Sequence, residues 1–145
     1  MFQLDPQLER DCVVIGRFPL CLLLLSRDAN YPWFILVPQR AGVTELYHLS
    51  SEDRAVFMAE SSTLSELLMD VFAGDKFNVA ALGNVVSQLH IHHIVRYRSD
   101  PAWPRPVWGA VPPLAYTPEN LQQRVKDLVP LLSGLECEVL FAGDN

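Results

Sequence analysis

The chain has 145 residues, enough for one domain with a hydrophobic core of its own. Half of the residues are hydrophobic, which argues against a disordered chain. The formal net charge of -6 argues against a broad surface for duplex nucleic acid, although it leaves room for a local anion site.

The three cysteines, Cys12, Cys21 and Cys137, are odd in number and widely spaced. We expect reduced thiols in a cytoplasmic protein, because the spacing shows no paired framework of the kind that secreted domains use. The first residues lack the basic start and the apolar core of a signal peptide. The longest apolar run, at residues 20–25, is much too short to span a membrane, so no membrane partner is expected.

In chain order, the hydrophobic pattern first predicts a short helix or arm and then three strands. The helix covers residues 3–11, and the strands cover residues 13–15, 20–26 and 33–37. The second strand is almost continuously apolar, which indicates that both of its faces are covered. Prolines flank the third strand on both sides and mark its ends.

A short helical turn is predicted near residues 44–49, and the longest helix follows it. Ser50 suits the N-cap of that helix, and apolar residues then recur at helical spacing until Gly74 ends the run. Two more strands are predicted at residues 76–82 and 89–98. These elements predict an α+β fold in which one long helix covers a mainly antiparallel, five-stranded sheet.

Five prolines rule out regular structure over residues 99–116. Thr117 and Pro118 then make a good helix start, Gly134 stops the helical pattern, and a last short strand is predicted at residues 137–141. We expect residues 1–112 to form the main domain. Residues 113–145 would be a C-terminal helical extension packed on the same domain.

Three of the four histidines lie between Gln88 and Ile94. If this stretch is a strand, Gln88, His90 and His92 share one face and His93 points to the other. A neutral imidazole is a good nucleophile toward phosphorus, provided that a partner such as a backbone carbonyl holds the proton on its other nitrogen. His90 is the natural nucleophile because it is central, and His92 and Gln88 would hold phosphate oxygens or the leaving group.

Two further polar residues, Asn84 and Ser87, lie just upstream and could add neutral hydrogen-bond donors to the same site. For His93 we predict a half-buried side chain under the long helix, with one hydrogen bond. A zinc site made by His90 and His92 would lack a third ligand at a recognised spacing, so no metal is expected.

The stretch and its surroundings resemble the histidine triad (HIT) family, whose motif is His-φ-His-φ-His-φ-φ, where φ is an apolar residue. Here Gln88 stands at the first histidine, and His93 stands at the sixth position, which is usually aliphatic. The resemblance covers roughly residues 10–110. It extends to a strand at residues 35–38 and a helix start at residues 49–53. It also includes a Gly-Asn element, Gly83-Asn84, and a Trp-Pro element, Trp103-Pro104.

The resemblance implies a HIT-like fold, usually as a homodimer with one sheet continuous across both subunits. It implies hydrolysis or transfer of nucleoside monophosphate groups without a metal or other cofactor. In that mechanism His90 forms a covalent nucleotidyl intermediate, and water then cleaves it. The proportions look most like bacterial members described as diadenosine tetraphosphate hydrolase-like.

The resemblance also implies substrate contacts outside the motif. Asp28 and Asn30 lie in the turn where the family often contacts ribose. Trp103 and Trp108 suit either packing or stacking on a base, and we include Trp103 among the expected substrate-binding residues.

Three functions follow from these residues. The first is a hydrolase of an adenosine-containing phosphoanhydride or phosphoramidate, with His90, His92 and Gln88 as its catalytic residues. The second is a nucleotide-binding module that has lost most turnover through Gln88; in that case Gln88→His should raise activity. The third is a structural homodimer whose histidine face is merely exposed.

Overall fold

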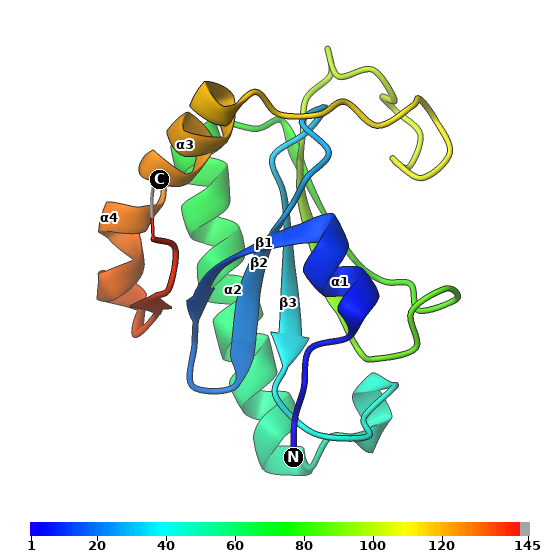
Figure 1. Ribbon diagram of the computed structural model, residues 1–145, viewed down its shortest axis with the longest axis vertical. Helices are drawn as coiled ribbons and strands as arrows, with labels where there is room; N and C mark the ends of the chain where they lie inside the picture. The colour runs from blue at the N-terminus through cyan, green and yellow to red at the C-terminus, as the bar shows by residue number, and fades with distance from the viewer. Residues whose placement is uncertain (143–145) are drawn as a thin grey trace.

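The computed structural model describes residues 1–142 and contains one antiparallel sheet with helices on both faces (Figure 1). Across the sheet the strands lie in the order β4 (Lys76–Ala81), β5 (Ile91–Arg96), β3 (Trp33–Pro38), β2 (Cys21–Ser26), β1 (Cys12–Arg17) and β6 (Glu138–Val139). Every neighbouring pair is antiparallel. The predicted α+β class and antiparallel sheet are therefore confirmed.

The sheet has six strands and not the predicted five, because the short strand predicted near the C-terminus joins it as β6. The two residues of β6 pair with the edge of β1, where Gly16 lies opposite Val139. A Cβ atom at Gly16 would lie 2.8 Å from both the Cys137 Sγ and the Glu138 carbonyl oxygen. The missing side chain in β1 therefore lets the C-terminal segment join the sheet, and a contact between such distant residues leaves no local signal.

The long helix α2 (Ser51–Phe72) covers one face of the sheet, as Figure 1 shows. The Ser50 hydroxyl accepts a hydrogen bond from the Asp53 N–H, as expected of an N-cap. Leu64 and Leu68 are fully buried against the strands. Gly74 does not supply the left-handed turn after α2: Ala73 does, with φ 49°. Gly74 is needed instead because a Cβ there would collide with Val95.

The short helix α1 (Pro6–Asp11) lies on the opposite face of the sheet from α2 (Figure 1). The Asp5 carboxylate caps it by accepting the Gln7 N–H at 2.8 Å. Leu8 is buried in a small cluster with residues of β1, β2 and β3. This side of the sheet is covered less completely than the α2 side, which leaves room for a cavity.

Side chains of β3 and β5 alternate between the two faces, as a strand requires. Phe34 and Val95 belong to the core under α2, whereas Trp33 and His92 face the α1 side. β5 begins at Ile91, two residues later than predicted, so Gln88 and His90 precede the strand.

The C-terminal segment forms α3 (Pro118–Lys126) and α4 (Val129–Leu132). Short 3-10 turns occur at η1 (Leu46–His48) and η2 (Ser133–Leu135). Val125, Leu128 and Leu132 are buried in the same core cluster as the sheet residues under α2. A domain boundary between residues 112 and 113 stays a prediction. Within residues 1–142 we find no helix with the length and apolar character that a bilayer crossing needs.

Candidate active site

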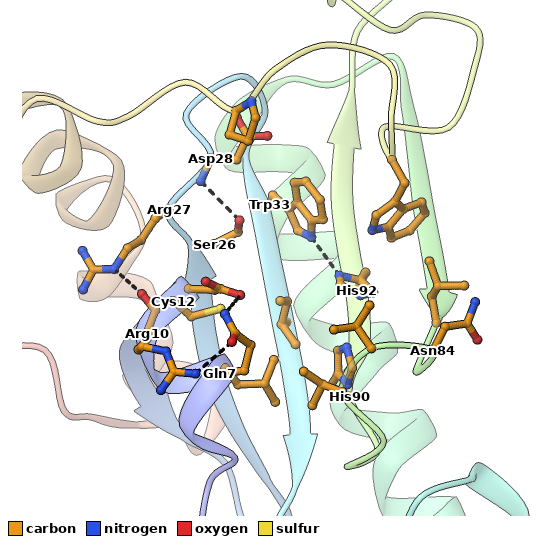
Figure 2. A pocket seen from close by; sticks show the side chains of 18 of the residues that line it. Gln7, Arg10, Cys12, Ser26, Arg27, Asp28, Trp33, Asn84, His90 and His92 are labelled. Atoms are coloured by element: carbon orange, nitrogen blue, oxygen red, sulfur yellow. Dashed lines mark hydrogen bonds between the residues drawn. The ribbon is translucent and has the colours of Figure 1, made fainter.

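A cavity of about 800 Å³ lies on the α1 side of the sheet (Figure 2). Residues of α1 form one wall, and Trp33 and Ile35 of β3 contribute to its lining. His90 and His92 line the other side, and both are 6% exposed. The structure therefore brings together the two histidines that the alternation argument placed on one face.

The tautomer of His90 is fixed by the main chain. Its Nδ1 lies 2.7 Å from the Gln88 carbonyl oxygen, which can only accept, so Nδ1 carries the proton. A neutral His90 ring therefore has a lone pair on Nε2, the nitrogen through which an imidazole held in this way can attack phosphorus.

His92 has the opposite tautomer. The indole N–H of Trp33 donates to its Nδ1 at 2.9 Å, a contact drawn in Figure 2, so a neutral His92 carries its proton on Nε2. Burial, with smaller contributions from His90 and His93, lowers the pKa of His92 to about 3. His92 therefore stays a neutral hydrogen-bond donor at ordinary pH.

The two rings stand side by side, with their centroids 5.1 Å apart. One ring offers a lone pair and its neighbour offers an N–H, which is the combination that attack on a phosphoryl group and stabilisation of its oxygens require. Cys12 also lines the cavity, but burial and then Asp11 raise the pKa of its thiol to about 12. Cys12 is consequently a poor competing nucleophile.

His93 faces the opposite side of β5 and is fully buried under α2. Its Nδ1 donates to the Ile91 carbonyl oxygen at 2.9 Å, and its Nε2 accepts from the Ser61 hydroxyl at 2.7 Å. Burial lowers the pKa of His93 to about 4. The ring lies under the long helix as predicted, but it is fully buried rather than half-buried and has two hydrogen bonds rather than one.

The Gln88 side chain does not line the 800 Å³ cavity. Its amide oxygen accepts the Asp5 N–H at 2.9 Å, and its amide nitrogen donates to the Gln3 carbonyl oxygen at 2.8 Å. Gln88 does border a smaller cavity of about 190 Å³ that His90 and Asn84 also line. With both ends of its amide bonded to the main chain, Gln88 is not placed to contact a phosphate in the large cavity, contrary to the expectation from the sequence.

The other predicted site residues divide into two groups. Asn84 and Asp28 line the large cavity, whereas Ser87 and Asn30 do not. The Asp28 carboxylate accepts hydrogen bonds from the main-chain N–H groups of Asn30 and Leu114. Asn30 in turn donates to the Asp28 carboxylate and to the Pro112 carbonyl oxygen, so the pair fastens the segment that forms the rim of the cavity.

The two tryptophans of the proline-rich segment have different surroundings. Trp108 lines the cavity, and its ring centroid lies 5.0 Å from that of His92 and 5.8 Å from that of Trp33. Trp103 is outside the cavity and packs against the guanidinium group of Arg96, which is buried in an ion pair with Asp100 at 2.7 Å. Stacking on a substrate base would therefore involve Trp108 and not Trp103.

Two parts of the cavity lining were not predicted from the sequence. Trp33 was assigned only as the start of a strand, although its position two residues before Ile35 puts it on the cavity face. The α1 residues Gln7, Leu8 and Arg10 also line the cavity. Their helix was predicted, but its docking beside the histidines depends on contacts across 80 residues that no local pattern reports. Among residues 1–142 no group of three His, Cys, Asp or Glu side chains is arranged to hold a metal ion.

Comparison with known proteins shows the family to which this fold belongs. The family model for the HIT domain matches residues 7–99. A histidine triad protein from Marinobacter aquaeolei is 52% identical, with a TM-score of 0.90 over 93% of this chain and 98% of that one. The chain therefore belongs to the HIT family, and the predicted HIT fold is confirmed.

Two further solved structures are similar over most of their length. A histidine triad protein from Bradyrhizobium japonicum is 43% identical, with a TM-score of 0.86 over 88% of this chain and 95% of that one. One from Sinorhizobium meliloti is 38% identical, with a TM-score of 0.87 over 90% and 96%. None of the curated proteins compared with the sequence matches it. Members of the family are commonly nucleotide hydrolases or transferases.

Proposed function

We propose that the protein hydrolyses an adenosine-containing phosphoanhydride or phosphoramidate through a covalent nucleotidyl-His90 intermediate. The observation that carries the proposal is the pair of opposite tautomers in one cavity. The Gln88 carbonyl leaves the Nε2 of His90 free to attack, and Trp33 leaves the Nε2–H of His92 free to donate. A diadenosine polyphosphate, as in the hydrolase branch that the sequence resembles, is one substrate of this class.

The reaction has two displacement steps. In the first, the Nε2 of His90 forms a bond to the α-phosphorus, and the bond from phosphorus to the leaving oxygen or nitrogen breaks. The leaving atom keeps the electron pair and takes a proton from water. In the second, water attacks the same phosphorus and gives its proton to the hydroxide left by the first step, the P–N bond breaks, and its electron pair returns to the Nε2 of His90. In both steps the Nε2–H of His92 donates to a phosphoryl oxygen.

The cavity also supplies groups for the rest of the substrate. Leu8, Ile35 and Trp108 give a largely apolar lining that suits a nucleobase. Asp28 and Asn84 also line the cavity, so we keep them as polar substrate contacts. Ser87, Asn30 and Trp103 are not carried into the proposal, because they lie outside the cavity.

Trapping of the intermediate tests the proposal. The protein is incubated with adenosine 5′-phosphoramidate or diadenosine tetraphosphate, quenched with acid-free denaturant and digested for mass analysis. We expect turnover and an adenylyl group on the peptide that contains His90, and both should disappear in His90→Ala. His48→Ala is the matched control, since His48 is exposed and lies outside the cavity. Absence of turnover and of adduct with both substrates would rule the hydrolase out.

A second candidate, a nucleotide-binding module with little turnover, is favoured by the placement of Gln88. The side chain at the first triad position delivers no group to the large cavity, which leaves His92 as the histidine donor beside His90. Calorimetry with AMP separates the two functions. Tight binding of AMP without hydrolysis of either substrate would support the binding module.

We also propose a homodimer in a reducing compartment such as the cytoplasm. β4 is an end strand of the sheet, and the apolar side chain of Val79 on it is 52% exposed. An unpaired strand edge with an exposed apolar side chain suits pairing with a second copy. The three cysteines are free and buried, which suits a reducing environment.

Light scattering during gel filtration tests the dimer. We expect twice the mass of one chain, and we expect Val79→Arg to give the single mass, because a charge at the paired edge would be buried between the copies. A single mass for the unchanged protein at micromolar concentration would contradict the homodimer.

A further inference from the structure

The side chain of Gln88 joins two distant parts of the chain. Its amide oxygen accepts the Asp5 N–H, and its amide nitrogen donates to the Gln3 carbonyl oxygen. Both bonds are to main-chain atoms, so they restrain the main chain of residues 3–5 and do not depend on the side chains there. The residue at the first triad position thus fastens the N-terminal segment to the stretch that carries His90.

The main chain of Gln88 has a separate task, because its carbonyl oxygen accepts the Nδ1 proton of His90 at 2.7 Å. The ladder of β5 does not hold this carbonyl, since the strand begins only at Ile91. Upstream the chain is exposed, and Val85 is 94% exposed. The Leu89 N–H, which belongs to the same peptide group as this carbonyl, donates to the Val43 carbonyl oxygen. The carbonyl that holds the His90 proton therefore has two restraints, this main-chain bond and the side-chain amide of Gln88.

The N-terminal segment also shapes the cavity. Asp5, which donates its N–H to Gln88, caps α1 with its carboxylate. Gln7 and Leu8 of α1 line the cavity, and Leu4 packs against the apolar cluster that contains Leu8. Loss of the hydrogen bonds of the Gln88 side chain would therefore affect α1, which is a wall of the cavity, as well as the Gln88 carbonyl that bonds to His90.

We propose that Gln88 is a positioning residue that couples the N-terminal segment to the tautomer of His90, and that its amide is not a phosphate ligand. This inference deepens the proposed function and rests on it for its catalytic consequence. It reverses an expectation from the sequence, that Gln88→His should raise activity. The two nitrogens of an imidazole stand at different distances from the main chain, so a histidine cannot replace both ends of the amide.

The test compares Gln88→Met with Gln39→Met in the full-length protein. Methionine keeps the length of the side chain and removes both hydrogen bonds. Gln39 is the matched control: its amide also donates to a main-chain carbonyl oxygen, that of Leu20 at 3.0 Å, and it does not line the cavity. Three quantities are measured, namely hydrogen exchange of residues 1–11, the ring ¹⁵N shifts of His90, and kcat and KM for adenosine 5′-phosphoramidate.

For Gln88→Met we expect exchange in residues 1–11 to speed up by about tenfold, as loss of two partly exposed hydrogen bonds implies. The ¹⁵N shifts should show both tautomers of His90 in place of one, with a lower kcat and a higher KM. Gln39→Met should change none of the three. Gln88→His should lower kcat/KM rather than raise it.

Two outcomes overturn the inference. One is a fall in kcat of Gln88→Met with exchange and ¹⁵N shifts unchanged, which would make the amide a direct ligand of the substrate. The other is no change in any of the three quantities. If Gln88→Met folds poorly, Gln88→Asn, which is too short to reach both main-chain partners, is measured in the same way. Exchange and ¹⁵N shifts need no turnover, so they decide the inference even if the hydrolase proposal fails.

Discussion

His92 and His93 are adjacent in the chain but belong to two different regions of the molecule. Both are buried, and burial lowers both pKa values, to about 3 and about 4. Their hydrogen bonds differ. Both ring nitrogens of His93 have protein partners, Ile91 and Ser61. Within residues 1–142 the ring of His92 has one hydrogen-bond partner, Trp33, and His92 lines the cavity.

The comparison shows that burial and a shifted pKa do not by themselves mark a functional histidine. His93, whose two ring nitrogens are both bonded within the buried core, has no nitrogen left for a ligand. A ring held by one nitrogen is oriented and still has a donor to offer. The side of β5 on which each residue lies is therefore consistent with the chemical role proposed for His92 and with a structural role for His93.

The largest effect within this comparison is expected for His92→Ala. Loss of a donor to the developing charge should lower kcat/KM by about 10²–10³-fold. Steady-state hydrolysis of adenosine 5′-phosphoramidate measures it, with His48→Ala as the control. A loss of less than about threefold would mean that the donor does not act in the rate-limiting step.

His93→Leu tests the structural role of His93. It leaves the Ser61 hydroxyl without its partner and alters the packing under α2, so the free energy of unfolding should fall by about 2–3 kcal/mol. Urea unfolding measures this change. The double variant with Ser61→Ala should recover part of the stability, because both partners are then apolar. A fall in kcat of the folded protein as large as that of His92→Ala would contradict the structural role.

Stability should decrease as the pH falls below about 6.5, the usual histidine pKa. The folded pKa values of His92 and His93 are depressed, to about 3 and about 4, so the unfolded chain binds more protons in this range and acid favours it. At pH 5 each histidine should cost on the order of 2 kcal/mol. Urea unfolding at pH 7.5 and pH 5 measures the sum, and His93→Leu should remove about half of it. Equal stability at the two pH values would contradict the burial of both rings as neutral groups.

The smallest effect is expected for Trp33→Phe, which removes the donor to His92 and keeps an aromatic ring. His92 could then adopt either tautomer, so kcat should fall by about tenfold with little change in KM. The ¹⁵N shifts of His92 should show the mixture directly. Tyr97→Phe is the control, since it loses a hydroxyl bond to the Phe72 carbonyl oxygen and lies outside the cavity. A kcat equal to that of the unchanged protein would mean that Trp33 does not set the tautomer.

The strands and the long helix could be predicted because period-2 and period-3.6 patterns are local. The two faces of β5 could be predicted for the same reason, and the His90–His92 pair with them. Trp108 and Trp103 could not be told apart, because the proline-rich segment between β5 and α3 has no period. Its path is fixed by a β-bridge from Asp28 to Ala115 and by the buried ion pair of Arg96 and Asp100.

Gln88 shows most clearly which features could not be predicted from the sequence. The sequence alone determined that an amide and two histidines, Gln88, His90 and His92, occur at intervals of two residues, and it predicted one shared face for all three. Only the tertiary structure decided that the amide contacts residues 3–5 and that Trp33 orients His92. Those bonds join residues 59 to 85 positions apart, and such contacts depend on how the elements pack rather than on any local pattern.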